Sequence, residues 1–240
     1  MGDIMEGRVL LNVKRHVQRP SECAIAAVTA LASFYDDDIT YNEVRTMIPK
    51  RKRRNGLYTS QQARLLNRLG YTKVTVVTAD LEMVDFTWAD LSKEALLCKL
   101  KRLRAYYGRA GSENKEIVHD MIEWLEAEGY DNQLRIDQDF PRYIRRSLDS
   151  GRPIGASFNW TALHKFSKSG KKGSLDGDIK GEPEHHAVVL RGYDDKGVFV
   201  VDSHSSSYKG RWKKYQNGYY KVSWEKFLVN AHAGDLILLG

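Results

Sequence analysis

The chain has 240 residues, of which 42% are apolar and 29% are charged. This balance is that of a folded globular protein, and it excludes a disordered, collagen-like or fibrous chain. The 38 lysines and arginines exceed the 31 aspartates and glutamates by seven, which favours acidic partners without the concentrated charge of a dedicated nucleic-acid binder. No apolar run approaches the roughly 20 residues that a membrane-spanning helix needs, so we expect no membrane segment.

The cysteine content and the N-terminal segment indicate the cellular compartment, and the chain length indicates the number of domains. Only two cysteines occur, Cys23 and Cys98, and the N-terminus lacks the basic start and continuous apolar stretch of a signal peptide. We therefore predict reduced thiols and a cytoplasmic protein. Since a typical domain has roughly 150 residues, the length predicts a single domain over residues 1–240, either one large domain or one that carries an insertion.

The first predicted elements are two helices and a strand. Residues 20–35 space their apolar side chains as a helix does, and Pro20 and Ser21 are helix-start signals. The alanines of this helix suit close packing inside a core. A basic turn at 49–56 precedes a second helix over 60–69, which Gly70 should end, and a strand over 71–78.

The middle of the chain, residues 79–134, is rich in charge and has a helical pattern. It contains two segments that each end at a glycine, Gly108 and Gly129, and a glycine is a common stop signal for a helix. We predict that this range is a helical insertion.

The last third of the chain reads mainly as strands. A helix over 140–148 is followed by a turn at 149–151 and a strand over 153–158, and a glycine- and lysine-rich loop at 165–184 is interpreted as a lid. Two strands within 187–202 are joined by a turn at 194–197, and a strand and helix at 219–229 precede a last strand at 235–239. The whole predicts an α+β fold in which a helical front half packs on a largely antiparallel sheet.

Cys23 lies in the first turn of the predicted N-terminal helix. There the positive end of the helix dipole and free backbone N–H groups favour a thiolate and lower its pKa. A nucleophilic cysteine is expected at such a position. The alternative is that Cys23 is a small buried residue of an alanine-rich helix, because free cysteines are often simply buried.

His186 and Asp202 lie at the two outer ends of the predicted hairpin. Counted outward from the turn, both residues lie at the open end of the hairpin. The carboxylate could therefore orient the imidazole while the imidazole activates a thiolate. The predicted triad is Cys23, His186 and Asp202. Gln18 could offer its side-chain amide to an oxyanion, together with the backbone N–H of Cys23. The alternative for His186 is a hydrogen-bonded histidine at a strand end.

The order of Gln18, then Cys23 at a helix start, then a histidine opening the strand HHAVVLRGY resembles the papain-like cysteine peptidases of the bacteriocin-processing, double-glycine-leader type. The segments TSQQARLLNRLGYTKVTVV, FPRYIRRSLDSGRPIGASF and VSWEKFL extend the resemblance over most of the chain outside 79–134. The resemblance implies a papain-like fold. It also implies that Cys23 is the nucleophile, His186 the base and Asp202 the orienting residue.

We predict no cofactor and no metal ion. Glu182, Glu184, His185, His186 and His204 are of metal-ligating types, but consecutive histidines of a strand point to opposite faces and could hardly share one ion.

These observations lead to a thiol-dependent hydrolase, a cysteine peptidase or amidase, acting on a peptide or protein substrate. The first alternative is an acyltransferase on the same fold, in which an amine takes the place of water. The second is a non-catalytic module that binds an acidic partner or nucleic acid, suggested by Ala24 where the family has glycine and by basic stretches at 50–54, 99–104 and 208–221. Because these stretches are separate and carry no binding motif, we interpret them as solvated surface rather than as a nucleic-acid site.

Overall fold

The computed structural model describes residues 3–5, 7–49, 56–110, 114–165, 168, 177–204, 217–231 and 234–240. Within these residues, nine strands form one sheet in the order β1-β2-β6-β5-β9-β3-β4, and β7 pairs with β6 and β8. The strands are β1 (Asp3–Met5), β2 (Arg8–Leu10), β3 (Lys73–Thr78), β4 (Asp131–Ile136), β5 (Ile154–Asn159), β6 (His185–Asp194), β7 (Gly197–Val201), β8 (Tyr219–Ser223) and β9 (Asp235–Leu239).

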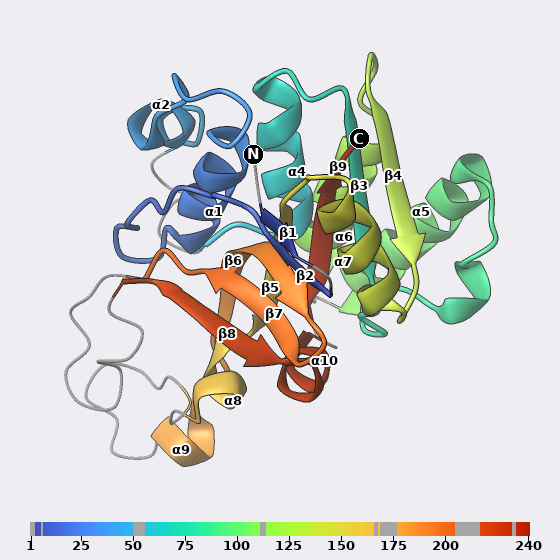
Figure 1. The fold of residues 1–240 in the computed structure, drawn as a ribbon. Helices are drawn as coiled ribbons and strands as arrows, with labels where there is room; N and C mark the ends of the chain where they lie inside the picture. The colour runs from blue at the N-terminus through green and yellow to red at the C-terminus, as the bar shows by residue number, and fades with distance from the viewer. Residues whose placement is uncertain are drawn as a thin grey trace.

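The described helices precede, interrupt and follow this sheet. They are α1 (Cys23–Ala32), α2 (Tyr41–Thr46), α4 (Thr59–Arg68), the 3-10 turn η1 (Phe86–Trp88), α5 (Lys93–Ala110), α6 (Asn114–Leu125), α7 (Phe140–Asp149), α8 (Trp160–His164), α9 (Gly177–Lys180) and α10 (Trp224–Ala231). Figure 1 shows α1, α2 and α4 grouped on one side of the sheet and α5 at the far edge beyond β4. The predicted α+β class with its helical front half is confirmed.

Helix α1 is fixed in position because nearly all of its side chains are buried in the core. Every residue from Ala24 to Ala32 is buried, and its alanines let the helix approach β6 closely, as the sequence predicted. Helix α4 contacts both α1 and β3. The N-terminus of α1 is therefore fixed against the sheet, where it carries Cys23.

The predicted insertion at 79–134 contains η1, α5, α6 and the beginning of β4. Strand β4 was not predicted, and it pairs in parallel with β3, from Lys73 opposite Asp131 to Thr78 opposite Ile136. The two helices thus form the long connection that parallel strands require. The predicted end of α5 at Gly108 was wrong, since the helix continues to Ala110; its packing against α6 offsets the roughly 1 kcal/mol that a helical glycine costs.

The predicted hairpin is formed by β6 and β7, with Asp194 opposite Gly197. The side-chain Oδ1 of Asp194 accepts the backbone N–H groups of Lys196 and Gly197 at 2.8 and 3.1 Å. A side chain at Gly197 would overlap the carbonyl oxygen of Val222, so this turn requires glycine. The register shifts between Leu190 and Gly192, which is a β-bulge close to the turn.

Three of the predicted features lie wholly or partly outside the described residues. These are the basic stretch at 50–54, half of the candidate lid at 165–184, and residues 208–216 of the basic stretch at 208–221. Among the helices that the structure describes, none has the length and apolarity needed to cross a membrane.

Candidate active site

The hairpin brings His186 and Asp202 into direct contact. His186 is the second residue of β6, and Asp202 follows the last residue of β7. The Nε2 atom of His186 lies 2.8 Å from Oδ1 of Asp202, and only 5% and 4% of these residues is exposed. A hydrogen bond buried to this degree is protected from competing water and fixes the ring orientation.

Cys23 meets the other side of the same imidazole. Its thiol is hydrogen-bonded to His186 and to the backbone N–H groups of Ala187 and Ala24. Since Nε2 of His186 is directed at Asp202, the nitrogen that faces the thiol is Nδ1. Cys23 remains partly exposed, as a group that attacks a substrate must be.

The three groups shift one another's pKa values in the direction of a charged pair. Burial raises the pKa of the Cys23 thiol, but the hydrogen bond and charge of His186, together with the backbone N–H groups of Ala187 and Ala24, outweigh burial and lower the pKa. Burial alone would lower the pKa of His186, whereas the Asp202 carboxylate raises it well above its ordinary value. Burial opposes charge on Asp202 as well, yet contact with His186 holds its pKa far below the ordinary range. The arrangement favours a thiolate beside an imidazolium.

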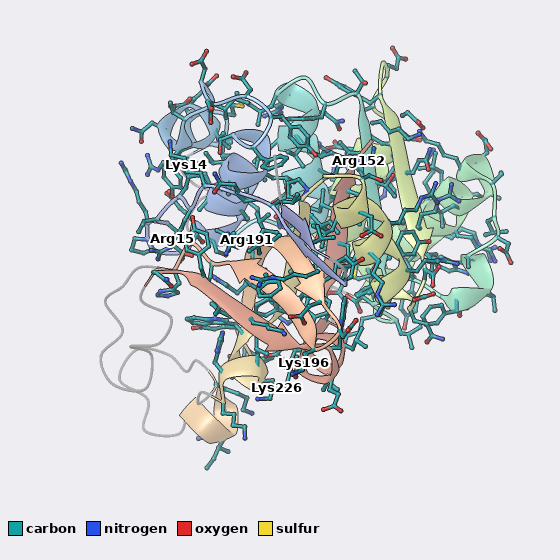
Figure 2. All side chains as sticks on the ribbon, in the orientation of Figure 1. Lys14, Arg15, Arg152, Arg191, Lys196 and Lys226 are labelled. Atoms are coloured by element: carbon teal, nitrogen blue, oxygen red, sulfur yellow. The ribbon has the colours of Figure 1, made fainter. Side chains whose placement is uncertain are left out.

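Asp202 has two further hydrogen-bond donors. The backbone N–H of His204 donates to Oδ1 at 2.7 Å, and the hydroxyl of Tyr220 donates to Oδ2 at 2.8 Å. Arg15 fixes the loop from outside: its Nε donates to the carbonyl oxygen of Asp202 at 2.7 Å, and its Nη2 donates to that of His204. Figure 2 shows Arg15 beside the start of β8. Both oxygens of the Asp202 carboxylate therefore accept hydrogen bonds, which fix its orientation toward the imidazole.

Trp160, the first residue of α8, covers the histidine. Its ring stacks on His186 with centroids 5.0 Å apart and on His204 with centroids 4.7 Å apart. Because those two imidazoles are themselves only 5.9 Å apart, they lie on the same face of the indole. This buried ring keeps water away from the bond between His186 and Asp202.

Hydrogen bonds hold the turn that precedes Cys23. The N–H of Glu22 donates to the carbonyl oxygen of Arg19 at 3.1 Å, and Ser21 has a left-handed φ of 62°. Proline at the second position and a left-handed residue at the third are the features of a type II turn. The hydroxyl of Tyr41 accepts the N–H of Arg19 at 3.2 Å and donates to Glu22 at 2.5 Å, so it bridges both ends of the turn.

Gln18 lies against the loop that carries Asp202. Its backbone N–H donates to the carbonyl oxygen of Ser203 at 2.9 Å, and its side-chain oxygen accepts the Ser203 hydroxyl at 2.8 Å. The four residues singled out in the sequence, Cys23, His186, Asp202 and Gln18, thus belong to one continuous set of contacts.

Sequence reasoning missed Arg15, Trp160, Ser203 and Tyr220, which surround these four residues. Tyr220 belongs to the basic stretch at 208–221 that the sequence analysis weighed as a nucleic-acid surface, but its hydroxyl donates to Asp202. A buried carboxylate needs donors besides the imidazole, and that requirement is the signal that could have prompted a search for them.

A model of the Peptidase_C39 like family matches residues 10–231. The match spans nearly the whole chain, so the chain belongs to this family and is a cysteine peptidase-like enzyme. It confirms the resemblance drawn from Gln18, Cys23 and the strand that begins HHAVVLRGY. No protein among those with curated descriptions matches the chain.

Two solved structures resemble this one. One is described as that of a C39-like peptidase from Bacillus anthracis, with 13% identity, a TM-score of 0.45, and coverage of 97% of this chain and 98% of that chain. The other is xylellain, a cysteine protease from Xylella fastidiosa, with 14% identity, a TM-score of 0.48, and coverage of 98% of this chain and 86% of that chain.

Proposed function

We propose that the protein is a thiol-dependent hydrolase, a cysteine peptidase or amidase, that cleaves a peptide-like substrate at Cys23. The observation that carries the proposal is the chain of contacts from the partly exposed Cys23 thiol through the buried His186 imidazole to the buried Asp202 carboxylate. In this proposal Cys23 is the nucleophile, His186 exchanges protons with the leaving group and water, and Asp202 orients the imidazole.

The reaction proceeds through two acyl transfers. The thiolate attacks the carbonyl carbon, a C–S bond forms, and the carbonyl π electrons move to oxygen. Collapse of this oxyanion breaks the bond to the leaving amine, which takes a proton from the His186 imidazolium. A water molecule then attacks the thioester while His186 accepts its proton, and the thiolate is released. An amine in place of water would give acyl transfer from the same thioester.

Two groups are suited to stabilise the oxyanion. The N–H of Cys23 lies in the first turn of α1, where backbone N–H groups have no intrahelical acceptor. The side-chain amide of Gln18 has its oxygen on Ser203, so its NH₂ group is available as the donor. We assign Gln18 to this role.

The proposed substrate is an acidic peptide or protein in the cytoplasm. The excess of seven positive charges favours such a partner, and part of this charge lies beside the site. Arg15 donates its backbone N–H to the hydroxyl of Tyr219, and the Arg191 guanidinium lies 4.6 Å from the centroid of the same ring (Figure 2). Charges in this place would raise the encounter rate with an acidic chain in a salt-dependent way.

The proposal is tested with p-nitrophenyl acetate, an activated ester, and with a tryptic peptide mixture. We expect release of p-nitrophenolate, an acetyl group on Cys23 in peptide maps, and cleavage of peptides detected by mass spectrometry. Cys23→Ala should reduce p-nitrophenolate release and peptide cleavage by at least about a thousandfold, with no acetylated residue at position 23 and an unchanged thermal unfolding midpoint.

The matched control is Cys98→Ala, which removes the other, exposed thiol of the chain. This variant should retain full activity. Ester and peptide cleavage that survive Cys23→Ala would show that the activity does not depend on this thiol, and the proposed mechanism would be wrong.

A further inference from the structure

Ser203 joins the loop of the triad to the candidate oxyanion donor. The residue directly follows Asp202 and is buried, with 6% of its surface exposed. Its hydroxyl donates to Oε1 of Gln18 at 2.8 Å, and its carbonyl oxygen accepts the Gln18 N–H at 2.9 Å. Two residues 185 positions apart in the chain are therefore connected through both backbone and side chain.

The contact determines which end of the Gln18 amide faces away from Ser203. A primary amide has an acceptor oxygen at one end and a two-hydrogen donor at the other. Its terminal torsion is broad, so an unrestrained amide turns readily. Only the orientation with Oε1 on Ser203 leaves the NH₂ group of Gln18 available to a substrate. Of the two ends of the amide, only NH₂ can donate a hydrogen bond to an oxyanion.

Ser203 is itself held rigidly enough to impose this orientation. Arg15 donates to the carbonyl oxygens on both sides of Ser203, those of Asp202 and His204. The N–H of Asp202 donates to the carbonyl oxygen of Gly218 at 2.8 Å. One short loop thus carries both the carboxylate that orients His186 and the hydroxyl that orients Gln18.

We propose that Ser203 is a positioning residue that orients the Gln18 amide for stabilisation of the oxyanion. This inference rests on the proposed function and assigns to the loop after Asp202 a second role. It predicts that loss of the Ser203 hydroxyl impairs only those reactions of Cys23 that pass through an oxyanion.

Two chemical probes distinguish reactions of Cys23 that pass through an oxyanion from reactions that do not. With p-nitrophenyl acetate, the Cys23 thiolate adds to the carbonyl carbon, an oxyanion forms, and its collapse expels p-nitrophenolate. With iodoacetamide, the same thiolate displaces iodide from a saturated carbon, so no oxyanion forms. The ratio of the two rates measures stabilisation of the oxyanion independently of how much thiolate is present.

We expect Ser203→Ala to slow acetylation of Cys23 about tenfold, which corresponds to the loss of one hydrogen bond, and to leave alkylation unchanged. Gln18→Ala should slow acetylation roughly 100-fold, because one oxyanion donor is lost. The double variant should be no slower than Gln18→Ala, since the hydroxyl acts through the amide. Ser203→Thr, which retains a hydroxyl, should restore acetylation.

The control is Ser147→Ala. Ser147, a residue of α7, is also buried, and its hydroxyl donates a hydrogen bond to the carbonyl oxygen of Arg152 at 3.0 Å. This variant should lower stability as Ser203→Ala does without changing the ratio of the two rates.

Unchanged acetylation in Ser203→Ala, or effects of Gln18→Ala and Ser203→Ala that simply multiply in the double variant, would overturn the role of Ser203. Parallel loss of acetylation and alkylation would overturn it too, because the defect would then lie in the thiolate. Wild-type protein whose Cys23 is alkylated but never acetylated would overturn the proposed function itself.

Discussion

Glu22 is a buried carboxylate directly before Cys23, and replacement by glutamine should destabilise the protein in a pH-dependent way. Only 5% of Glu22 is exposed, and Nε of Arg45 donates to its two oxygens at 3.0 and 2.9 Å. Burial raises the pKa of Glu22, but the hydrogen bonds of Arg45 and Tyr41 outweigh burial and lower it. The charged form is therefore the one that the fold stabilises.

The magnitude follows from these contacts. Breaking a fully buried ion pair costs about 3–5 kcal/mol, but the Arg45 side chain is 26% exposed, so water can solvate it in the variant. We expect Glu22→Gln to lower the free energy of unfolding by about 2–3 kcal/mol at neutral pH. Because the pKa is depressed in the folded state, this contribution is full above the unfolded-state pKa of about 4.3 and is lost as the pH falls through the lower folded-state value.

Urea denaturation at a series of pH values measures this difference. The gap between wild type and Glu22→Gln should be constant near neutrality and should shrink below about pH 4. Glu43→Gln, an exposed carboxylate on α2, is the control and should change stability by less than about 0.5 kcal/mol. A gap that is absent at pH 7, or that keeps its full size in acid, would refute the reasoning.

The remaining predictions concern the turn before the nucleophile. Ser21 has a φ of 62°, a conformation that costs non-glycine residues about 1–2 kcal/mol. Ser21→Gly should raise the free energy of unfolding by up to about 1 kcal/mol, and Ser21→Val should lower it by about 1–2 kcal/mol, both measured by urea denaturation. Equal stabilities of the two variants would contradict a left-handed residue at this position.

Local signals in the sequence accounted for the residues that lie at element ends. Cys23 was placed by a helix start, and His186 and Asp202 by the two ends of a hairpin whose turn was recognisable. The groups around them come from elsewhere: Trp160 from α8 and Tyr220 from β8. Their approach to the site depends on tertiary packing, which no single segment encodes.

The strands that sequence reasoning missed have equally specific causes. Strands β1 and β2 have three residues each, too short for a pattern of alternation. Strand β4 includes Asn132, a polar residue that is fully buried because it donates to the carbonyl oxygen of Trp124 and accepts from Asn67. A buried polar residue whose hydrogen bonds are made inside the core interrupts the alternation of apolar and polar residues by which a strand is recognised in a sequence.

The central claim, a Cys23 thiolate held by His186, is tested most directly by the pH dependence of alkylation with iodoacetamide, followed by peptide mapping. Exposed Cys98 serves as the internal reference. Cys23 should react rapidly at about pH 6, well below the pKa of about 8.5 of an ordinary thiol, and His186→Ala should remove this reactivity while Cys98 stays unchanged. Labelling of Cys23 no faster than that of Cys98, and unaffected by His186→Ala, would contradict the account.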